Sequence, residues 1–341
     1  MSLLPSTSPY QLGQASVRGV MLQVLLALLP AIATYVWLLG PIILVQIAVA
    51  SVSALVGEAL LLKARGKPLG LFLGDGSALV TAWLVALTFP PLAPWWLVAL
   101  GALFAIVVAK QLYGGLGQNP FNPAMIAFAA CIVAFPALMS TWPPLPLAYG
   151  FSEQLQAVFG LLPHVDAMNG ATPLDALKTS LKLGEGSVTV STLLADPEVF
   201  GRIAGRGWEW IAAGYLVGGL FMLWRGIIRW QGPLAFIAGM STIAGLCWAL
   251  HPDQFADPLF HLFSGGALMG AFFIVTDPVS GCTTPRGQLF FGFAAGILAY
   301  LIRVFGGYPD GVAFAVLLLN LCAPLIDRYT QPAVFGWRKT R

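Results

Sequence analysis

The sequence predicts an all-α integral membrane protein with about ten transmembrane helices, arranged as two inverted five-helix repeats with broken helices. Three observations predict this fold class. First, 58% of the 341 residues are hydrophobic and only 9% are charged, whereas a soluble domain carries about 25% charged residues. Second, apolar runs long enough to cross a bilayer recur along the chain. Third, short sequence motifs of the N-terminal half recur in the C-terminal half.

The first repeat is expected over residues 19–139, after a cytoplasmic N-terminus at 1–18. Its apolar runs predict helices at 19–39, 41–62, 77–90, 94–112 and 122–139. The run from Val20 to Leu39 is too long for the apolar region of a typical signal peptide and lacks a cleavage site, so it is interpreted as the first transmembrane helix. The third run is short and begins at a glycine-rich turn, which is typical of a broken helix.

A polar segment at 140–207 is predicted to lie outside the membrane on the extracytoplasmic side. The second repeat then follows at 208–326, with helices at 208–225, 232–250, 259–275, 287–304 and 309–326. The eighth run is predicted to be broken, like the third. Residues 327–341 form the predicted cytoplasmic C-terminus.

The repeat is indicated by two pairs of echoes about 190 residues apart. Lys110-Gln-Leu-Tyr-Gly-Gly115 is echoed by Arg303-Val-Phe-Gly-Gly307, and Ser77-Ala-Leu79 is echoed by Gly266-Ala-Leu268. Because each unit holds an odd number of helices, the second copy must be inverted relative to the first. Chance similarity between glycine-rich turns is the alternative.

The positive-inside rule orients the chain. With both termini in the cytoplasm, 12 of the 17 basic residues fall inside and 5 fall outside. Four of those five lie in or beside the long polar segment, where the rule has little force. The five basic residues predicted to lie outside are Lys178, Lys182, Arg202, Arg206 and Arg303.

Composition excludes several kinds of site and partner. Cys131, Cys247, Cys282 and Cys322 form no CxxC pair and only three histidines are present, so no zinc or iron–sulfur site is predicted. The net charge of +3 gives no reason to expect nucleic acid. Cys282 can be a packing residue or a redox residue.

Thr172 is the candidate attachment point for a covalent cofactor. It follows the two small residues Gly170 and Ala171, which leave space beside its hydroxyl, and it precedes Pro173. The same pattern predicts a helix N-cap, with proline at the first helical position and Asp175 three residues on. The two interpretations are compatible, because a phosphate on the hydroxyl would lie at a helix N-terminus.

A second motif joins Lys110 to the fifth predicted helix through Gly114-Gly-Leu-Gly-Gln-Asn-Pro-Phe-Asn-Pro123. Its glycines permit close backbone approach, and Asn119 and Asn122 offer hydrogen-bond donors and acceptors. The loop is suited to a flat heteroaromatic ring, or it serves only to satisfy a helix break.

Carboxylates near the bilayer are candidates for an ion path, because a buried charge there is costly. They are Glu58 near the end of the second helix, Asp75 before the third, and Asp277 in the polar loop after the eighth. Glu58 and Asp75 lie close to a predicted interface, where that cost falls. Asp277 can instead pair with Arg286, while Thr283 and Thr284 can cap the ninth helix.

Taken together, the chain resembles the RnfD/NqrB family of membrane redox subunits. The motifs that carry the resemblance occur in family order along nearly the whole chain: Ser8-Pro9 with Met21 to Pro30, Asp75-Gly-Ser-Ala-Leu79, Gly114 to Pro123, Gly170-Ala-Thr-Pro-Leu174, Thr276-Asp-Pro-Val-Ser280 and Thr283-Thr-Pro-Arg-Gly287. The short N-terminus resembles the RnfD type more than the NqrB type.

The resemblance implies FMN bound covalently to Thr172 through a phosphoester, installed by a flavin transferase. It also implies a non-covalent riboflavin, which we expect near Asn119 and Asn122. The implied fold is similar to that of urea and ammonium transporters. Implied partners are the subunits RnfA, RnfB, RnfC, RnfE and RnfG, together with lipid of the bacterial inner membrane, where the protein is expected as a multi-pass subunit.

The function implied is electron relay in a translocase that couples ferredoxin and NAD redox chemistry to Na⁺ or H⁺ movement. The subunit is not expected to be active alone, because the chain lacks a dinucleotide-binding pattern. An NqrB-like role in a sodium-pumping NADH:quinone oxidoreductase and a non-redox channel for small solutes are the alternatives.

Overall fold

The computed structural model describes residues 16–145, 147, 149–161, 170–184, 188–197, 199–308 and 310–332, and this part is helical without strands. Most of the predicted tails at 1–18 and 327–341 lies outside these residues, as do residues 162–169 of the polar segment. Five helices are long and apolar enough to cross a membrane: α1 (Val17–Leu39), α2 (Ile42–Ala64), α12 (Gln231–Leu250), α15 (Pro285–Phe305) and α16 (Val312–Thr330).

Shorter apolar helices complete the bundle. The first half adds α3 (Leu69–Leu73), α4 (Ser77–Thr88), α5 (Trp95–Phe104), the π-helix η1 (Ala105–Gln111), α6 (Pro123–Ala134) and α7 (Pro136–Ser140). The second half adds α11 (Trp208–Trp224), α13 (Pro258–Phe263), α14 (Ala267–Met269) and the π-helix η3 (Gly270–Ile274). Each of the ten predicted apolar runs therefore contains helix.

Several predicted boundaries were wrong, and the backbone explains why. The fifth run is two helices, because Phe135 leaves helical geometry before Pro136. The eighth run is broken, as predicted, and the break lies at residues 264–266, where Gly265 has a φ of +61°. The third run ends at Thr88, so α4 has only 12 residues and a length of about 18 Å, well short of a bilayer core of about 30 Å.

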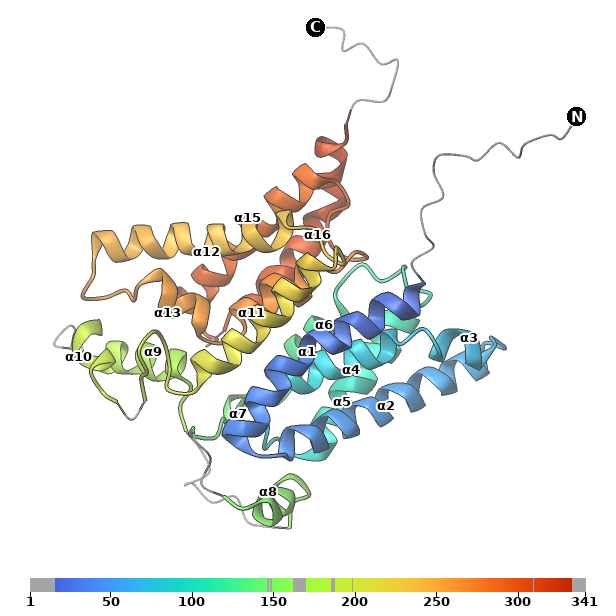
Figure 1. Ribbon diagram of the computed structural model, residues 1–341, viewed down its shortest axis with the longest axis horizontal. Helices are drawn as coiled ribbons and strands as arrows, with labels where there is room; N and C mark the ends of the chain where they lie inside the picture. Colours follow the sequence, from blue (N-terminus) through green and yellow to red (C-terminus); the bar gives the residue numbers. More distant parts are fainter. Residues whose placement is uncertain are drawn as a thin grey trace, which may run out of the picture.

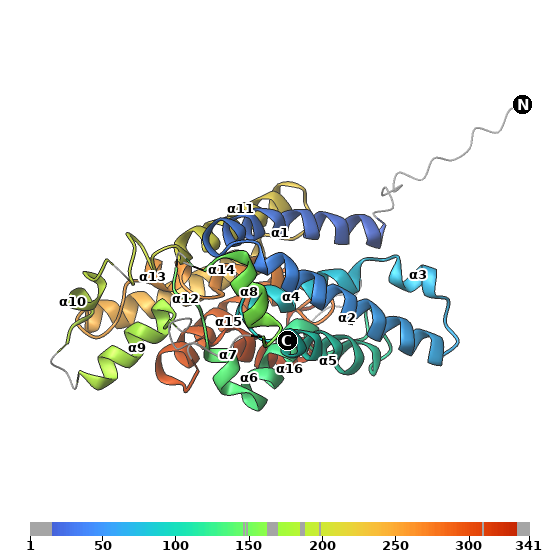
Figure 2. The same ribbon diagram turned by 90° about the horizontal axis from the view of Figure 1, so that it is seen from below.

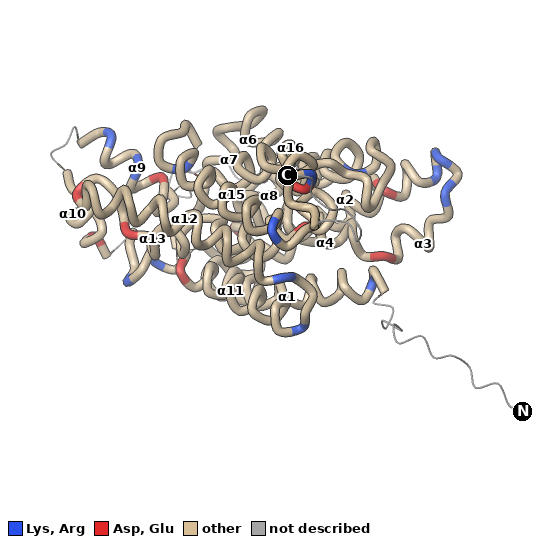
Figure 3. Tube along the Cα trace, turned by 90° about the horizontal axis from the view of Figure 1, so that it is seen from above, with Lys and Arg blue, Asp and Glu red and all other residues tan. Residues whose placement is uncertain are grey.

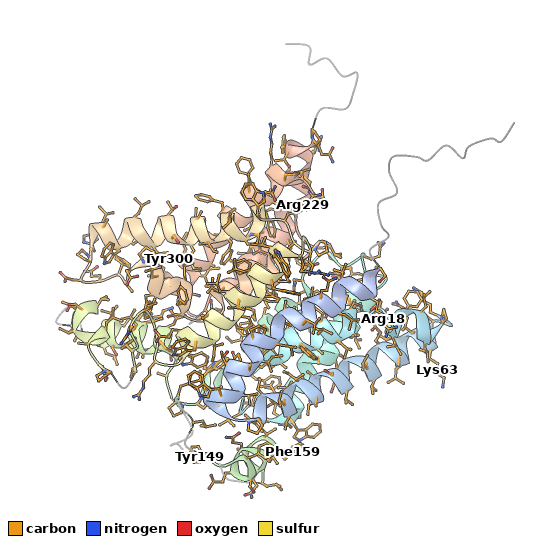
Figure 4. The ribbon with its side chains drawn as sticks, in the orientation of Figure 1. Arg18, Lys63, Tyr149, Phe159, Arg229 and Tyr300 are labelled. Carbon is orange, nitrogen blue, oxygen red and sulfur yellow. The ribbon has the colours of Figure 1, made fainter. Side chains whose placement is uncertain are left out.

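The polar segment between the halves carries three helices of its own, α8 (Phe151–Val158), α9 (Pro173–Leu183) and α10 (Val190–Leu194). In Figure 1 they lie at the lower and left edges, whereas α1 begins and α16 ends at the upper right. Figure 4 places Arg18, Lys63 and Arg229 along one side of the molecule and Tyr149 and Phe159 on the opposite side. We call these the Arg18 side and the Thr172 side.

Glycines allow the long helices to touch. α1 and α11 lie side by side in two perpendicular views (Figure 1 and Figure 2). A Cβ on Gly218 of α11 would lie 1.8 Å from the Ala27 carbonyl oxygen of α1, and one on Gly239 of α12 would lie 2.1 Å from the Phe293 oxygen of α15. Only glycine permits these crossings, as in small-residue packing between membrane helices.

Charged residues gather at the helix ends and loops, and the long helices are mostly uncharged between them (Figure 3). Three charged side chains are nevertheless buried within the described part of the bundle: Glu58, Lys110 and Arg303. Lys110 and Arg303, the two members of the predicted echo, each form an ion pair, Lys110 with Glu58 and Arg303 with Asp310.

Candidate functional site

Thr172 is the N-cap of α9, on the Thr172 side of the bundle. Its backbone is extended, and its Oγ1 accepts a hydrogen bond from the Asp175 amide at 3.2 Å. Pro173 occupies the first helical position, where the missing N–H costs nothing. The predicted helix cap is therefore confirmed. The threonine side chain is half-buried, and Ala171 before it is exposed.

Two contacts hold the threonine in place. The Gly170 amide donates to the Trp142 carbonyl at 2.6 Å in an isolated antiparallel bridge. A Cβ on Gly170 would lie 3.0 Å from the Pro144 nitrogen, so a larger residue would disturb this bridge. Gly205 packs against Pro173 so closely that a Cβ there would lie 1.8 Å from the proline ring. Small residues on both sides thus seat the start of α9.

Thr172 lies at the edge of a cavity that enters the bundle, which we call the Thr172 cavity. The empty space, its open side included, is about 940 Å³. Its walls come from both halves of the chain and are mainly aromatic, aliphatic and methionine side chains. The lining includes Leu87, Met125, Phe128, Ile132, Met139, Trp142, Trp208, Ile211 and Met269.

The aromatic walls are ordered by mutual contacts. Trp142 and Trp208 meet edge to face with ring centroids 5.4 Å apart. Tyr35 and Tyr215 also line the cavity. The Tyr35 hydroxyl donates to the Leu87 carbonyl at 3.4 Å, and the buried Tyr215 hydroxyl lies beside the Tyr35 hydroxyl and interacts with it.

Helix α9 is anchored to the bundle by Lys178. Its ammonium donates to the carbonyls of Arg303, Gly306 and Tyr308 at 3.0, 2.6 and 3.1 Å. These carbonyls stand at the C-terminal end of α15, where unsatisfied acceptors and the helix dipole favour a cation. Leu174 and Leu177 of α9 pack in a small core with Phe200 and Phe260. The position of Thr172 is therefore tied to α15.

A second cavity opens on the Arg18 side, and we call it the Asn122 cavity. Its empty space is about 930 Å³, and Asn119, Asn122, Lys110 and Asp277 are among its lining residues. Asn122 is the N-cap of α6, where its Oδ1 accepts from Ala124 and Met125. Asn119 donates to the Phe121 carbonyl at 3.0 Å. Both side chains are buried, and they shape the loop as well as line the cavity.

Asp277 meets Asn122 and not Arg286, so the predicted Asp277–Arg286 pair was wrong. Asp277 Oδ2 accepts from Asn122 Nδ2 at 3.3 Å and from Ser280 Oγ at 2.8 Å. Desolvation raises the pKa of Asp277, and these hydrogen bonds oppose the rise. The structure thus brings two predicted site residues, 155 positions apart, onto one cavity. Of the two threonines, Thr284 caps α15 and Thr283 donates to Asp327.

The other two carboxylates belong to one polar network. Glu58 Oε1 accepts from Lys110 Nζ and from Gln111 Nε2, each at 2.7 Å. Lys110 also donates to Ser77 Oγ at 2.6 Å, and Ser77 in turn donates to Asp75. Glu58 is 1% exposed, so its carboxylate is buried inside the protein. Lys110 and Ser77 connect this network to the Asn122 cavity.

Cys282 is a packing residue in this structure. It is buried, and its thiol contacts the Ala323 carbonyl at 3.7 Å. Burial, followed by the nearby charge of Asp327, raises the pKa of this thiol to about 12. A thiol held in the protonated form is a poor nucleophile and a poor metal ligand.

The two cavities approach one another from opposite sides of the bundle. Neighbouring residues of α6 line different cavities, Ala124 the Asn122 cavity and Met125 the Thr172 cavity. Phe273 of η3 lines the Asn122 cavity and meets the Tyr215 ring edge to face at 6.0 Å. The wall between the cavities is therefore one ring contact thick at this point.

Comparisons with known proteins agree along nearly the whole chain. The family model described as NQR2, RnfD, RnfE matches residues 4–336. A Yersinia pseudotuberculosis protein (serotype I), named as the D subunit of an ion-translocating oxidoreductase complex, is 48% identical over 346 residues, covering 97% of each chain. An Escherichia coli protein (strain SE11) of the same name is 48% identical over 349 residues, covering 98% of each chain.

Proposed function

The chain belongs to the NQR2, RnfD, RnfE family, and from this premise we propose that it is the RnfD component of an Rnf-type ion-translocating oxidoreductase complex, carrying FMN on Thr172. It is a multi-pass membrane protein. In the proposed complex it relays electrons between other subunits and is inactive alone. Its partners are RnfA, RnfB, RnfC, RnfE and RnfG, with a flavin transferase acting during maturation.

The observation that carries the proposal is the position of Thr172 at the edge of an aromatic and methionine-lined cavity. A phosphoester on its Oγ1 would place the phosphate at the N-terminus of α9, where free backbone amides and the helix dipole favour an anion. The ring system would lie among Trp142, Trp208 and Met139. The Tyr215 hydroxyl, which lies beside that of Tyr35, offers it a hydrogen-bond donor. The residues present therefore fit the group.

A bound flavin supplies one-electron chemistry, and the protein positions it and tunes its potential. Esterification converts the Thr172 hydroxyl into a poorer hydrogen-bond acceptor and frees the Asp175 amide to donate to the phosphate. Lys178 holds α9 on α15, so the attachment point stays at the cavity edge. The apolar walls keep bulk water away from the ring.

We assign the Asn122 cavity to the second, non-covalent flavin, riboflavin. It offers amide groups from Asn119 and Asn122, a cation at Lys110 and a carboxylate at Asp277. The proposed ion path begins with the carboxylates near this cavity, Glu58, Asp75 and Asp277, for Na⁺ or H⁺. Two inverted repeats in the bacterial inner membrane, with both termini in the cytoplasm, complete the proposed arrangement.

Three features support the inverted repeat. Lys110 and Arg303, which stand in corresponding positions, are both buried and both paired to a carboxylate. Gly76 and Gly266 stand at the start of α4 and α14 in corresponding places. The α1–α11 pair joins the first helix of one repeat to the first helix of the other, and α6 and α16 join the last helices.

The test is flavin fluorescence of the denatured protein in a gel, after co-expression with the flavin transferase. We expect fluorescence from the wild type and none from Thr172→Ala. Thr189→Ala is the matched control, because Thr189 is the N-cap of α10 in the same polar segment, so cap loss is common to both variants. A dark wild type in the presence of active transferase, or a bright Thr172→Ala, would overturn the assignment.

A further inference from the structure

A third cavity lies on the Thr172 side, between α9, residues 254–256 and the last turn of α15, and Leu174 is the lining residue that it shares with the Thr172 cavity. Its empty space is about 940 Å³ with the open side included. Three cationic side chains line it, Lys178, Lys182 and Arg303, together with His261, and no carboxylate among the described residues does. We call it the cationic cavity. A positive enclosure of this kind selects anions.

The cationic charge is only partly compensated. The Lys178 ammonium is occupied by three backbone carbonyls, and Asp310 accepts from Arg303 Nη2 at 3.1 Å from outside the cavity. Burial lowers the pKa of Lys178, and the neighbouring charge of Lys182 lowers it further, while Asp175 raises it. Lys182 itself is exposed and reaches the cavity one helical turn beyond Lys178. Its charge is therefore free to bind a ligand.

Two buried nitrogen atoms in the cavity lining lack hydrogen-bond partners in the part of the chain that the structure describes. Arg303 is 2% exposed, and its Nε has no acceptor there although Nη1 and Nη2 are both occupied. His261 is 4% exposed, and its Nδ1 has no partner there. Buried polar atoms without partners are rare in folded proteins and costly. An oxygen-rich anion in the cavity would satisfy the guanidinium.

The cavity opens to an apolar surface where membrane-spanning helices end. Phe305 at the end of α15 lines the cavity and is 63% exposed, and it meets Phe255 with ring centroids 6.0 Å apart. Leu250 at the end of α12 is 72% exposed. Both helices are long enough to cross a bilayer. In a bilayer spanned by these helices, the cavity mouth would lie near the level of the lipid headgroups, with Phe305 beside the acyl chains.

We propose that the cationic cavity binds the phosphate of an anionic phospholipid from the leaflet on the Thr172 side. The phosphate oxygens would accept from Lys182 and from the unpartnered nitrogen of Arg303, and an acyl chain would lie along Phe305. Basic pockets beside membrane helices bind anionic headgroups in this way. Such a lipid would join α9 to α12 and α15, and this role does not depend on the flavin.

Native mass spectrometry of the detergent-purified full chain tests the proposal, with phosphatidylglycerol, phosphatidylcholine and inorganic phosphate titrated in separate arms. We expect wild-type protein to bind phosphatidylglycerol several-fold more tightly than phosphatidylcholine. Lys182→Gln should weaken phosphatidylglycerol binding about tenfold, as expected for the loss of one charge-assisted hydrogen bond. Arg202→Gln, an exposed cation of the same polar segment outside the cavity lining, should leave it unchanged.

Equal affinity for the two lipids would overturn the proposal, and so would unchanged phosphatidylglycerol binding by Lys182→Gln. Thermal stabilisation by inorganic phosphate without a preference for phosphatidylglycerol would identify a free anion as the ligand and overturn the lipid assignment. Circular dichroism melts of both variants control for folding. Because Lys182 is exposed, its substitution should leave the melting temperature unchanged.

Discussion

Tyr215 brings a buried hydroxyl to the Thr172 cavity, where it interacts with the Tyr35 hydroxyl. Its ring also forms part of the wall toward the Asn122 cavity. A phenol in this position can donate to a flavin, and it favours the reduced form when that form carries negative charge. Tyr215 is thus a positioning and tuning residue in the proposed site.

We expect Tyr215→Phe to retain covalent flavin and to lower its midpoint potential. A net hydrogen bond of about 0.5–1.5 kcal/mol corresponds to about 20–60 mV for one electron. Spectroelectrochemical titration of the purified protein measures the shift. Tyr300→Phe is the control, because Tyr300 on α15 (labelled in Figure 4) is also buried, interacts with Cys247 and does not line the Thr172 cavity. Equal shifts in both variants would contradict the assignment.

Glu58 and Lys110 form a buried ion pair that depends on both members. Glu58→Gln leaves the Lys110 charge without its counter-ion, which typically costs about 3–5 kcal/mol, whereas removing both charges is often neutral. We expect a markedly lower melting temperature for Glu58→Gln and recovery in the Glu58→Leu, Lys110→Met double variant. Arg65→Gln, which loses one hydrogen bond to Gln111, is the control and should show little change.

The double variant also distinguishes the contribution of Glu58 to stability from a role in ion transport. If Glu58 belongs to the ion path, a complex containing the stable double variant will transfer electrons without moving ions across proteoliposome membranes. Normal ion movement in that complex would remove Glu58 from the path.

At the residue scale, sequence reasoning identified groups whose local chemistry is unusual. Thr172 matches a helix N-cap pattern and also belongs to the Gly170-Ala-Thr-Pro-Leu174 motif. A carboxylate in a membrane segment, such as Glu58, stands out because burying its charge is energetically costly. Tyr215 gave no comparable signal, because an aromatic residue in an apolar run is typical of ordinary packing. Its partner Phe273 is 58 positions away, and only the folded chain brings the two rings together.

At the element scale, the close helix crossings depend on single glycines. Gly239 of α12 packs directly on the α15 backbone, whereas a Cβ at Gly245 of the same helix would meet only the Pro258 ring at 3.6 Å, an ordinary contact. Gly239 is therefore required by helix packing, whereas Gly245 is dispensable.

We expect Gly239→Ala to destabilise the protein by about 1–3 kcal/mol through overpacking. Gly245→Ala should be neutral or slightly stabilising, since alanine favours helix more than glycine does. Thermal unfolding of the two variants in the same detergent makes the comparison. Equal melting temperatures would show that the α12–α15 contact is looser than described.

Apolar length predicted where the helices are, because burial in lipid requires about 20 apolar residues in a row. Hydropathy did not predict the π-helices η1 and η3, since these leave composition nearly unchanged, whereas the break in the eighth run was predicted. The break before Pro136 was readable in principle, because the residue before a proline avoids helical geometry.

At the scale of the whole molecule, orientation follows from the charge distribution and can be measured. Arg18 and Lys63 share one side with Arg229, and α8 lies on the other (Figure 4). In a cysteine-free background, we expect Ser152→Cys on α8 to react with a membrane-impermeant maleimide in spheroplasts. Gly70→Cys on α3, which has open space around it, should react only after lysis. The reverse pattern would invert the proposed topology.

The cavities could not be predicted from sequence, because each collects residues from both halves of the chain. The Thr172 cavity joins Tyr35 of α1 to Val312 of α16, and the Asn122 cavity joins Val20 to Val279. Local patterns supplied Thr172, Asn119, Asn122 and Asp277 as separate candidates. Their grouping into two sites depends on the tertiary packing.

Electrons and ions differ in whether they could cross the thin wall at Tyr215 and Phe273. An electron crosses packed rings by tunnelling and needs no opening, whereas a sodium ion or proton needs water or a chain of polar groups. The described wall would therefore let electrons pass and would block sodium ions and protons. A mutation that opened a cavity in this wall, without moving the residues around the two rings, would admit water. Ions would then leak across the membrane, while the electron path would stay nearly intact.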